Sequence, residues 1–199
     1  MTTGEKMSGF TKEIIIKTLF ELLNEKALGK ITVKDIVERC GVNRNTFYYH
    51  FRDISDVVEY ALLREVDHVF ESQVDVGSVL EGLEVLVNLM GENKKAMLHI
   101  YCSVQRDVFT NALDKMCDYI VRQYVEHNFD KGILEKEEMK ILMHFYKCVM
   151  TGIILDWMDH RMSYDLTEYA NKLRDLHGNS FEKALEKAAG EKPATLKLM

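Results

Sequence analysis

The chain has 199 residues, of which 47% are hydrophobic and 10% aromatic, with a single proline at Pro193. This composition is sufficient for a folded core, and the lack of proline before Pro193 permits long helices. No continuous run of 18 apolar residues occurs, so we expect neither a transmembrane helix nor a membrane partner. The first residues, Met1 to Lys6, lack the apolar region of a signal peptide, which predicts a cytoplasmic protein.

Charge is distributed unevenly along the chain. The formal net charge is −6, yet the segment through Arg52 carries nine Lys and Arg against six Asp and Glu. The remainder carries 17 against 26. The N-terminal part can therefore approach an anionic polymer, while the acidic remainder faces away from it. The four cysteines show no CxxC spacing, which favours free thiols in a cytosolic protein.

The first predicted helix extends from about Thr11 to Ala27 and follows a loose arm of residues 1–9. A second helix is predicted from Val33 to Cys40. Thr32 and Asp35 have the spacing of a capping box at its start, and the apolar residues that follow recur every three or four positions.

A third, short helix is predicted from Arg44 to about Phe51. Gly41 suits the left-handed residue that ends the preceding helix, and Asn43 is a favoured N-cap. The three-residue connection is typical of a helix-turn-helix, whose second helix enters the DNA major groove. Two helices joined at a glycine also occur in many proteins that bind no DNA. Here the caps, the turn and an outward set of polar side chains agree, which favours DNA binding.

The segment from Thr11 to about Leu63 resembles the DNA-binding domain of the tetracycline-repressor (TetR) family. The resemblance is carried by Thr32–Val37, by Gly41–Asn43 and by the run Thr-Phe-Tyr-Tyr-His-Phe at Thr46–Phe51. The stretch from residue 44 to residue 51 also resembles regulators linked to dihydroxyacetone kinase operons.

One position departs from the pattern of the resembled family. Members often carry a lysine at the start of the fourth helix that contacts a phosphate, and this chain has Ile54 there. Arg52 is a candidate to replace that contact.

The candidate DNA contacts divide into base readers and groups that hold the backbone. Arg44 and Asn45 are expected to read bases, because arginine pairs with guanine and asparagine with adenine. Tyr49 could instead pack inside the domain, and Thr32 could act only as a cap. The remaining candidates are Thr32, Lys34, Thr46, Tyr48, Tyr49, His50 and Arg52.

The rest of the chain reads as helices throughout. A fourth helix, capped by Ser55, is predicted to residue 73, followed by helices over 79–92, 94–104, 107–129, 136–160 and 166–188. The sequence therefore predicts an all-α fold. Residues 1–54 would form a three-helix helix-turn-helix DNA-binding domain, and residues 55–199 a larger helical ligand-binding and dimerisation domain.

The helix over 136–160 is apolar on nearly all sides, so several of its faces must be buried. The resemblance implies a homodimer in which this helix and the last one pair with their copies. The alternative is a monomeric helical core. The candidate interface residues are Met150, Ile153, Ile154, Trp157, Leu166, Leu173 and Leu176.

The resemblance also implies a cavity for an unknown small-molecule effector. Methionine and aromatic residues suit an adaptable apolar pocket, although they suit a helical core equally well. The candidates are His99, Tyr101, Cys102, Phe109, Met116, Tyr119, His144, Tyr146 and Met150. The pairs His99/Cys102 and His144/Cys148 share helix faces but lack the spacing of a metal motif, so no metal or other cofactor is expected.

The leading hypothesis is a ligand-responsive, dimeric transcriptional regulator, by family default a repressor. It would read a palindromic double-stranded DNA operator through Arg44–His50. The alternative is a helical protein-interaction adaptor or co-regulator that has lost or weakened DNA binding. Combined alanine substitution of Arg44 and Tyr48 would separate the two. The sequence contains no nucleophile elbow, phosphate loop or HExxH motif, so we expect no enzyme.

Overall fold

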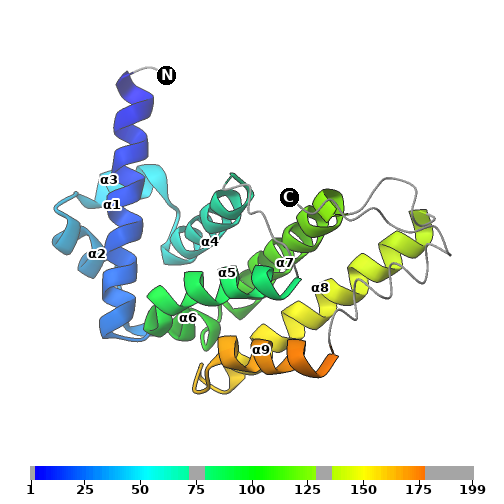
Figure 1. Cartoon of the computed structure of the whole chain (residues 1–199). Helices are drawn as coiled ribbons and strands as arrows, with labels where there is room; N and C mark the ends of the chain where they lie inside the picture. Colours follow the sequence, from blue (N-terminus) through cyan, green and yellow to red (C-terminus); the bar gives the residue numbers. More distant parts are fainter. Residues whose placement is uncertain (1–2, 72–78, 129–135, 178–199) are drawn as a thin grey trace. The chain divides into compact units, whose positions relative to one another are not determined.

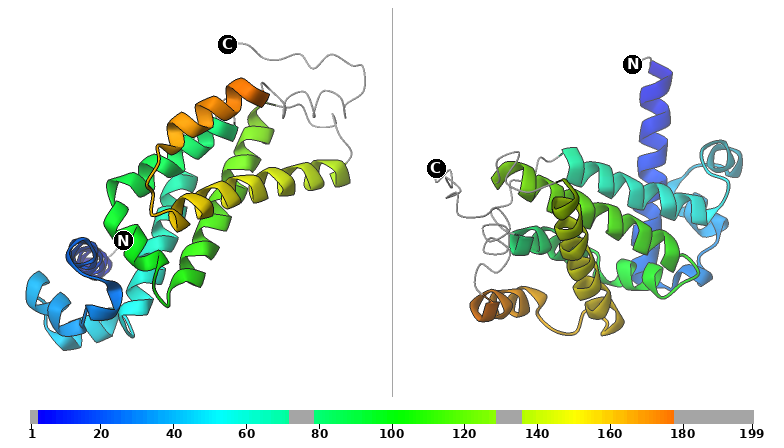
Figure 2. Two further views of the ribbon diagram at one scale, coloured as in Figure 1. Left: turned by 90° about the horizontal axis from the view of Figure 1, so that it is seen from below. Right: turned by 90° about the vertical axis from the view of Figure 1, so that its right-hand side faces the viewer.

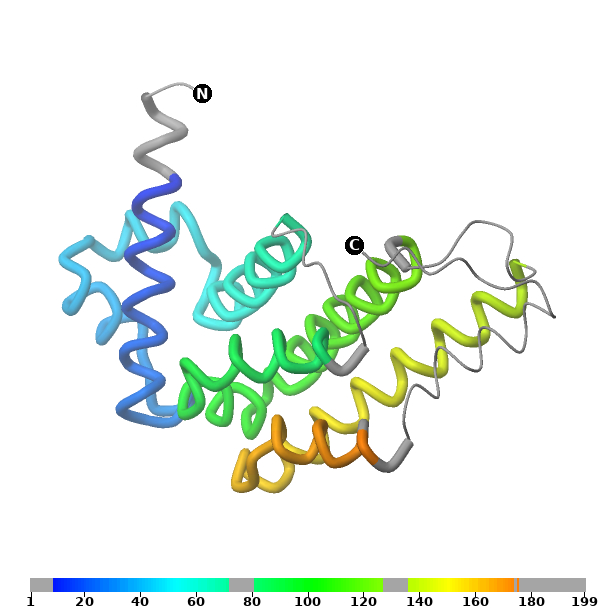
Figure 3. Tube along the Cα trace, in the orientation of Figure 1, coloured from blue at the N-terminus to red at the C-terminus, as the bar shows by residue number. Residues whose placement is uncertain are grey.

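The computed structural model describes residues 3–71, 79–128 and 136–177, and the regular structure within these ranges is helical (Figures 1 and 3). This confirms the predicted all-α fold. The chain divides into two compact units. The first comprises residues 1–68 and 90–112, and the second comprises residues 69–89 and 113–199. The functional division after residue 54 remains a prediction.

The first unit begins with α1 (Thr3–Glu25), followed by the 3-10 turn η1 (Leu28–Lys30). The loose arm predicted for residues 1–9 is wrong from Thr3 onward, because these residues are helical. They lack an apolar stripe that would mark a helix in the sequence. No proline interrupts them, so the backbone hydrogen bonds of α1 continue to Thr3.

Helices α2 (Val33–Cys40) and α3 (Arg44–His50) both contact α1 and lie beside it in Figures 1 and 2. The bounds of α2 match the predicted ones, and α3 ends one residue before the predicted Phe51. The core between them is built from completely buried aliphatic and aromatic side chains, which stabilise the three-helix arrangement by removing apolar surface from water. These are Ile15, Leu19, Leu23, Ile36 and Phe47.

Helix α4 (Ile54–Glu71) begins one residue before the predicted start. The backbone N–H of Asp56 donates to Asp53 Oδ1 at 2.9 Å, so Asp53 caps this helix. The predicted Ser55 cap is wrong, since the Ser55 hydroxyl accepts a hydrogen bond from Gln105 Nε2 at 2.7 Å. Aspartate is as good an N-cap as serine, and Asp53 lies at the position where the helix actually starts.

Helix α5 (Val79–Glu92) matches its prediction, and α6 (Lys94–Tyr101) contacts α1 within the first unit. The prediction for α6 continued to Val104, but the helix ends at Tyr101. The Ser103 hydroxyl donates to the carbonyl of Ile100 at 2.6 Å and accepts from the Gln105 N–H. Such local bonds compete with helix continuation, which accounts for the early end.

The second unit contains most of α7 (Arg106–Asn128), with α8 (Lys136–Asp159) and α9 (Leu166–His177). The part of the last helix predicted beyond residue 177 lies outside the described residues. The buried side chains of this core include Cys117, Ile120 and Tyr124 on α7 and Met150, Ile154 and Trp157 on α8. Helix α8 is long and apolar enough to cross a membrane. The core helices of other folded proteins meet the same criterion, so length and composition alone are weak evidence for a membrane span.

Candidate nucleic-acid interface

The start of α2 is held by the predicted capping box. Thr32 Oγ1 accepts from the Asp35 N–H at 3.2 Å, and Asp35 Oδ2 accepts from the Thr32 N–H at 2.8 Å. The other end of α2 stops at Gly41, whose φ of 73° is left-handed, as predicted. Both ends of the helix are therefore determined by side chains within a few residues of them.

Two ion pairs fasten α2 to the end of α1. Lys26 Nζ lies 2.9 Å from Asp35 Oδ2, and Arg39 donates to both carboxylate oxygens of Glu25 at 2.6 and 2.9 Å. Hydrogen bonds from Lys26 and Thr32 lower the pKa of Asp35 to about 2. The Arg39 guanidinium likewise lowers the pKa of Glu25. These pairs orient α2. Lys34, in its first turn, is exposed and lies 3.6 Å from Glu38 Oε1 in a surface ion pair.

Helix α3 is capped by Asn43, as predicted. Asn43 Oδ1 accepts from the Thr46 N–H at 2.8 Å and from the Thr46 hydroxyl at 3.1 Å. Phe47 and Phe51 are buried, with ring centroids 6.1 Å apart, and Phe51 also contacts the Tyr60 ring of α4. The two phenylalanines fix the rotation of α3 about its axis, so its remaining side chains are directed outward.

The outward face of α3 combines charged, amide and phenol groups. Arg44 and Asn45 are exposed, and Tyr48 and Tyr49 are 57% and 81% exposed. The exposure of Tyr49 excludes the alternative that it packs inside the domain. Large aromatic side chains held in water on a rigid helix are available to a partner, since their hydroxyls can donate to phosphates.

Thr46 and His50 are half-buried at the margins of this face. The Thr46 hydroxyl donates a hydrogen bond to Asn43 Oδ1, so its role in this structure is to support the N-cap of α3. Burial and the charge of Lys12 hold the pKa of His50 below its ordinary value. The lowered pKa favours the neutral imidazole, which can contact DNA as a hydrogen-bonding group.

Lys12 is the residue that sequence reasoning missed. Its Nζ lies 4.4 Å from the centroid of the Tyr60 ring and 5.8 Å from that of Phe51, at the corner between α3 and α4. A signal was present, because Lys12 is three and four residues before the buried Ile15 and Ile16 and so shares their face of α1. It adds a cation at the C-terminal end of α3.

Arg52 and Ile54 follow α3. The Arg52 side chain is 81% exposed and lies 3.4 Å from Asp56, while its backbone N–H donates to the same carboxylate. Such an exposed pair is weak, so the guanidinium can exchange this partner for a phosphate. Ile54 is half-buried and lines a cavity.

The predicted effector residues are distributed over both units. His99 and Cys102 line one cavity of the first unit, whereas Tyr101 and Phe109 are buried and form an edge-to-face ring pair. In the second unit Met116 and Met150 are buried, Tyr119 stacks on Phe70, and Tyr146 is half-buried. His144 is exposed, with its Nε2 3.6 Å from Cys148 Sγ. No group of three or more metal-ligating side chains occurs among the described residues.

The predicted interface residues are mostly interior. Met150, Ile154, Trp157 and Leu166 are buried within one chain, and Ile153 and Leu173 are half-buried. The Leu176 side chain lies outside the described ones. The apolar side chains that α8 and α9 do expose are Ile141, Phe145, Val149 and Tyr169.

Comparison with known proteins adds two family matches. Residues 15–61 match a model described as bacterial regulatory proteins, tetR family, and residues 77–178 match one described as transcriptional regulator C-terminal region.

A curated relative and a solved structure are also similar. The HTH-type dhaKLM operon transcriptional activator DhaS of Lactococcus lactis subsp. lactis (strain IL1403) is 23% identical over 133 residues. That alignment spans 67% of this chain and 66% of the relative, just under two thirds of its length. The solved dihydroxyacetone kinase operon activator DhaS superposes with a TM-score of 0.72 at 15% identity, covering 89% of this chain and 97% of that one.

Proposed function

Because the chain belongs to the TetR family of transcriptional regulators, we propose that it binds a palindromic DNA operator as a homodimer and responds to a small-molecule effector. The exposed face of α3 carries the proposal: Arg44, Asn45, Tyr48 and Tyr49 project from a helix capped at Asn43 and anchored by Phe47. Arginine and asparagine read base edges, while tyrosines and Lys34 hold phosphates. Residues 1–54 would act as the DNA-binding domain and residues 55–199 as the ligand-binding and dimerisation domain.

Dimerisation is supported by the exposed apolar face of α8. Ile141, Phe145 and Val149 are spaced by four residues, so they form one stripe along the helix. Pairing of two such stripes would bury them and hold two recognition helices about 34 Å apart, one turn of the duplex. The half-buried Ile153 continues the stripe, while the buried candidates Met150 and Ile154 support it from within.

The relative and the resembled family differ in whether the regulator activates or represses transcription. The Lactococcus relative is an activator. We therefore favour activation of transcription over the repression expected from the family. The protein would act in the cytoplasm, at an operator beside the genes that it regulates. Both modes use the same contacts with DNA, so the site itself does not depend on this choice.

Selection from random duplex DNA at two salt concentrations tests the proposal. We expect enrichment of a palindrome, with an affinity that falls steeply as salt rises because phosphate-bound counterions are released. The double variant Arg44→Ala with Tyr48→Ala should abolish enrichment. The control Arg122→Ala, an exposed arginine of α7 paired with Asp118, should retain it. Absence of enrichment by the wild type would favour the protein-interaction alternative.

A further inference from the structure

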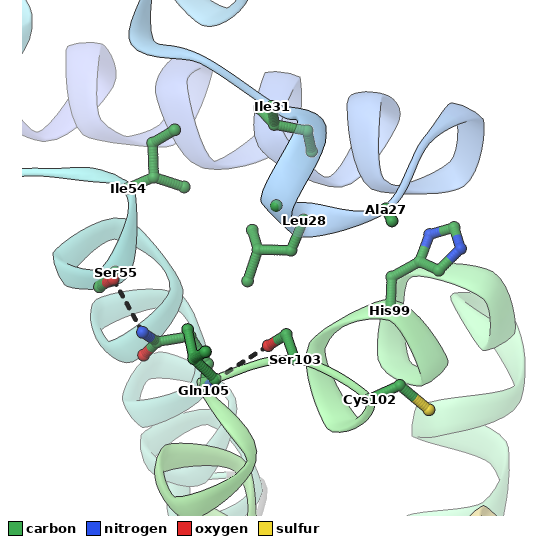
Figure 4. A pocket seen from close by; sticks show the side chains of 11 residues that line it. Ala27, Leu28, Ile31, Ile54, Ser55, His99, Cys102, Ser103 and Gln105 are labelled. Atoms are coloured by element: carbon green, nitrogen blue, oxygen red, sulfur yellow. Dashed lines mark hydrogen bonds between the residues drawn. The ribbon is translucent and has the colours of Figure 1, made fainter.

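A cavity of about 620 Å³ lies within the first unit, between η1, the first turn of α4 and the end of α6 (Figure 4). Its walls come from three segments that are distant in sequence. Leu28 and Ile31 belong to η1 and the residue after it, and Ile54 to the first turn of α4. His99 and Gln105 come from α6 and the loop that follows.

The lining is mainly apolar and contains no Asp, Glu, Lys or Arg side chain. A charged ligand would lose its hydration here without gaining an ion pair, so the cavity suits a neutral molecule. Its volume is in the range of small-molecule sites, which combine an apolar wall with a few polar groups.

Two of those polar groups retain unused hydrogen-bonding capacity. His99 Nδ1 lies 2.7 Å from the Leu23 carbonyl, which can only accept, so Nδ1 carries a proton, and in the neutral imidazole Nε2 is then an acceptor. The Ser55 hydroxyl accepts from Gln105 Nε2 at 2.7 Å, which leaves its own hydrogen free to donate (Figure 4). The two groups lie on opposite sides of the cavity in Figure 4, so either one, beside the apolar wall, can bond a ligand hydroxyl.

We propose that this cavity is a binding site for a neutral, mainly apolar molecule bearing a hydroxyl group, such as an aromatic alcohol. The ligand would bridge the segment before α2, the first turn of α4 and the end of α6. It would thereby restrain the segments on either side of the recognition helix, which deepens the ligand response proposed above. A ligand that prefers one arrangement of these segments shifts the population toward it.

Cys102 can report whether the cavity is occupied, because it lines the cavity and its side chain is exposed. Cys148 is also exposed, lies on α8 and has no part in this cavity, so it serves as an internal control. The experiment measures alkylation of both thiols in the full chain by iodoacetamide, with peptide mass spectrometry as readout and 2-naphthol as the probe. At a probe concentration ten times its dissociation constant, Cys102 should react about tenfold more slowly, since only the unoccupied fraction reacts.

Three comparisons make the result specific. The charged analogue 2-naphthalenesulfonate should give little protection. Ile54→Trp should fill the cavity and abolish protection, while Leu63→Trp, farther along α4, should preserve it. His99→Phe keeps a ring but removes the Nε2 acceptor together with the Nδ1–H that donates to the Leu23 carbonyl, and should raise the half-protecting concentration about threefold to tenfold.

The inference is overturned if 2-naphthol leaves the Cys102 rate unchanged, if it slows Cys148 equally, or if protection persists in Ile54→Trp. Circular dichroism of each variant establishes that it is folded, and His99→Phe provides a second test should Ile54→Trp unfold. Labelling does not require DNA. Operator enrichment without Cys102 protection would therefore contradict only this site, whereas protection without enrichment would contradict only the proposed DNA function.

Discussion

Arg39 donates two parallel hydrogen bonds to Glu25, at 2.6 and 2.9 Å, and so joins the last turn of α2 to the last turn of α1. The pair lies on the surface, where one ion pair adds little to stability. Its two-point geometry instead restricts the direction of α2. Lys26, which follows α1 directly, forms a second ion pair with Asp35 in the first turn of α2. Both ends of α2 are therefore attached to the C-terminal end of α1.

Acid should loosen this attachment. The pKa of Asp35 is lowered to about 2 by Lys26 and Thr32, so its stabilising contribution is complete above about pH 4 and is lost as pH falls toward 2. In urea unfolding between pH 4 and pH 2, the wild type should lose stability more steeply than Asp35→Asn. Asp67→Asn, which changes an exposed carboxylate on α4, should retain the wild-type slope. Equal slopes in all three proteins would contradict the role of Asp35.

Gly41→Ala should destabilise the first unit by about 1 kcal/mol, because its φ of 73° is left-handed and costs an L-residue that much. An added Cβ would meet nothing within 4 Å, so the penalty is conformational and not steric. Gly9→Ala is the matched control, since Gly9 lies inside α1 and alanine there should stabilise by about 0.5 to 1 kcal/mol. Chemical denaturation measures the change in the free energy of unfolding for both variants. A change of the same sign in both would show that the left-handed conformation of Gly41 does not determine the effect.

Arg44→Ala and Lys34→Ala should weaken DNA binding in different ways. Loss of Arg44 should reduce operator affinity about tenfold to hundredfold and relax the preference at one base position. Loss of Lys34 should weaken all sequences alike and reduce the slope of affinity against salt by about one. Binding titrations at several salt concentrations, with Lys115→Ala as control, distinguish the two. A strong change of sequence preference in Lys34→Ala would show that Lys34 reads bases.

Phe145→Asp should convert the proposed dimer into monomers. Phe145 is 57% exposed between Ile141 and Val149 on α8, and a carboxylate there would remain unpaired and desolvated in the interface. Phe10→Asp places the same charge at an exposed phenylalanine of α1 and should leave the dimer intact. Sedimentation velocity at micromolar concentration tests both variants. A monomeric wild type, or a dimeric Phe145→Asp, would contradict the proposed interface.

The site was most predictable where its determinants are close in sequence. The Thr32 capping box, the left-handed Gly41 and the Asn43 cap each act over three or four residues, and the structure confirms all three. The cap of α4 was mispredicted by two residues, because Asp53 and Ser55 are equally suitable caps when only composition is considered.

The sequence by itself determined the all-α fold, the helix-turn-helix and the outward face of α3, since helix periodicity and capping are local properties of the chain. Tertiary structure alone placed Lys12 against the rings of Phe51 and Tyr60 and brought His99 within hydrogen-bonding distance of the Leu23 carbonyl, 76 residues away. It also decided which apolar residues of α8 are buried and which are exposed. A helix that is apolar on nearly every side can be oriented only by the side chains packed against it, so its periodicity could not separate core from interface.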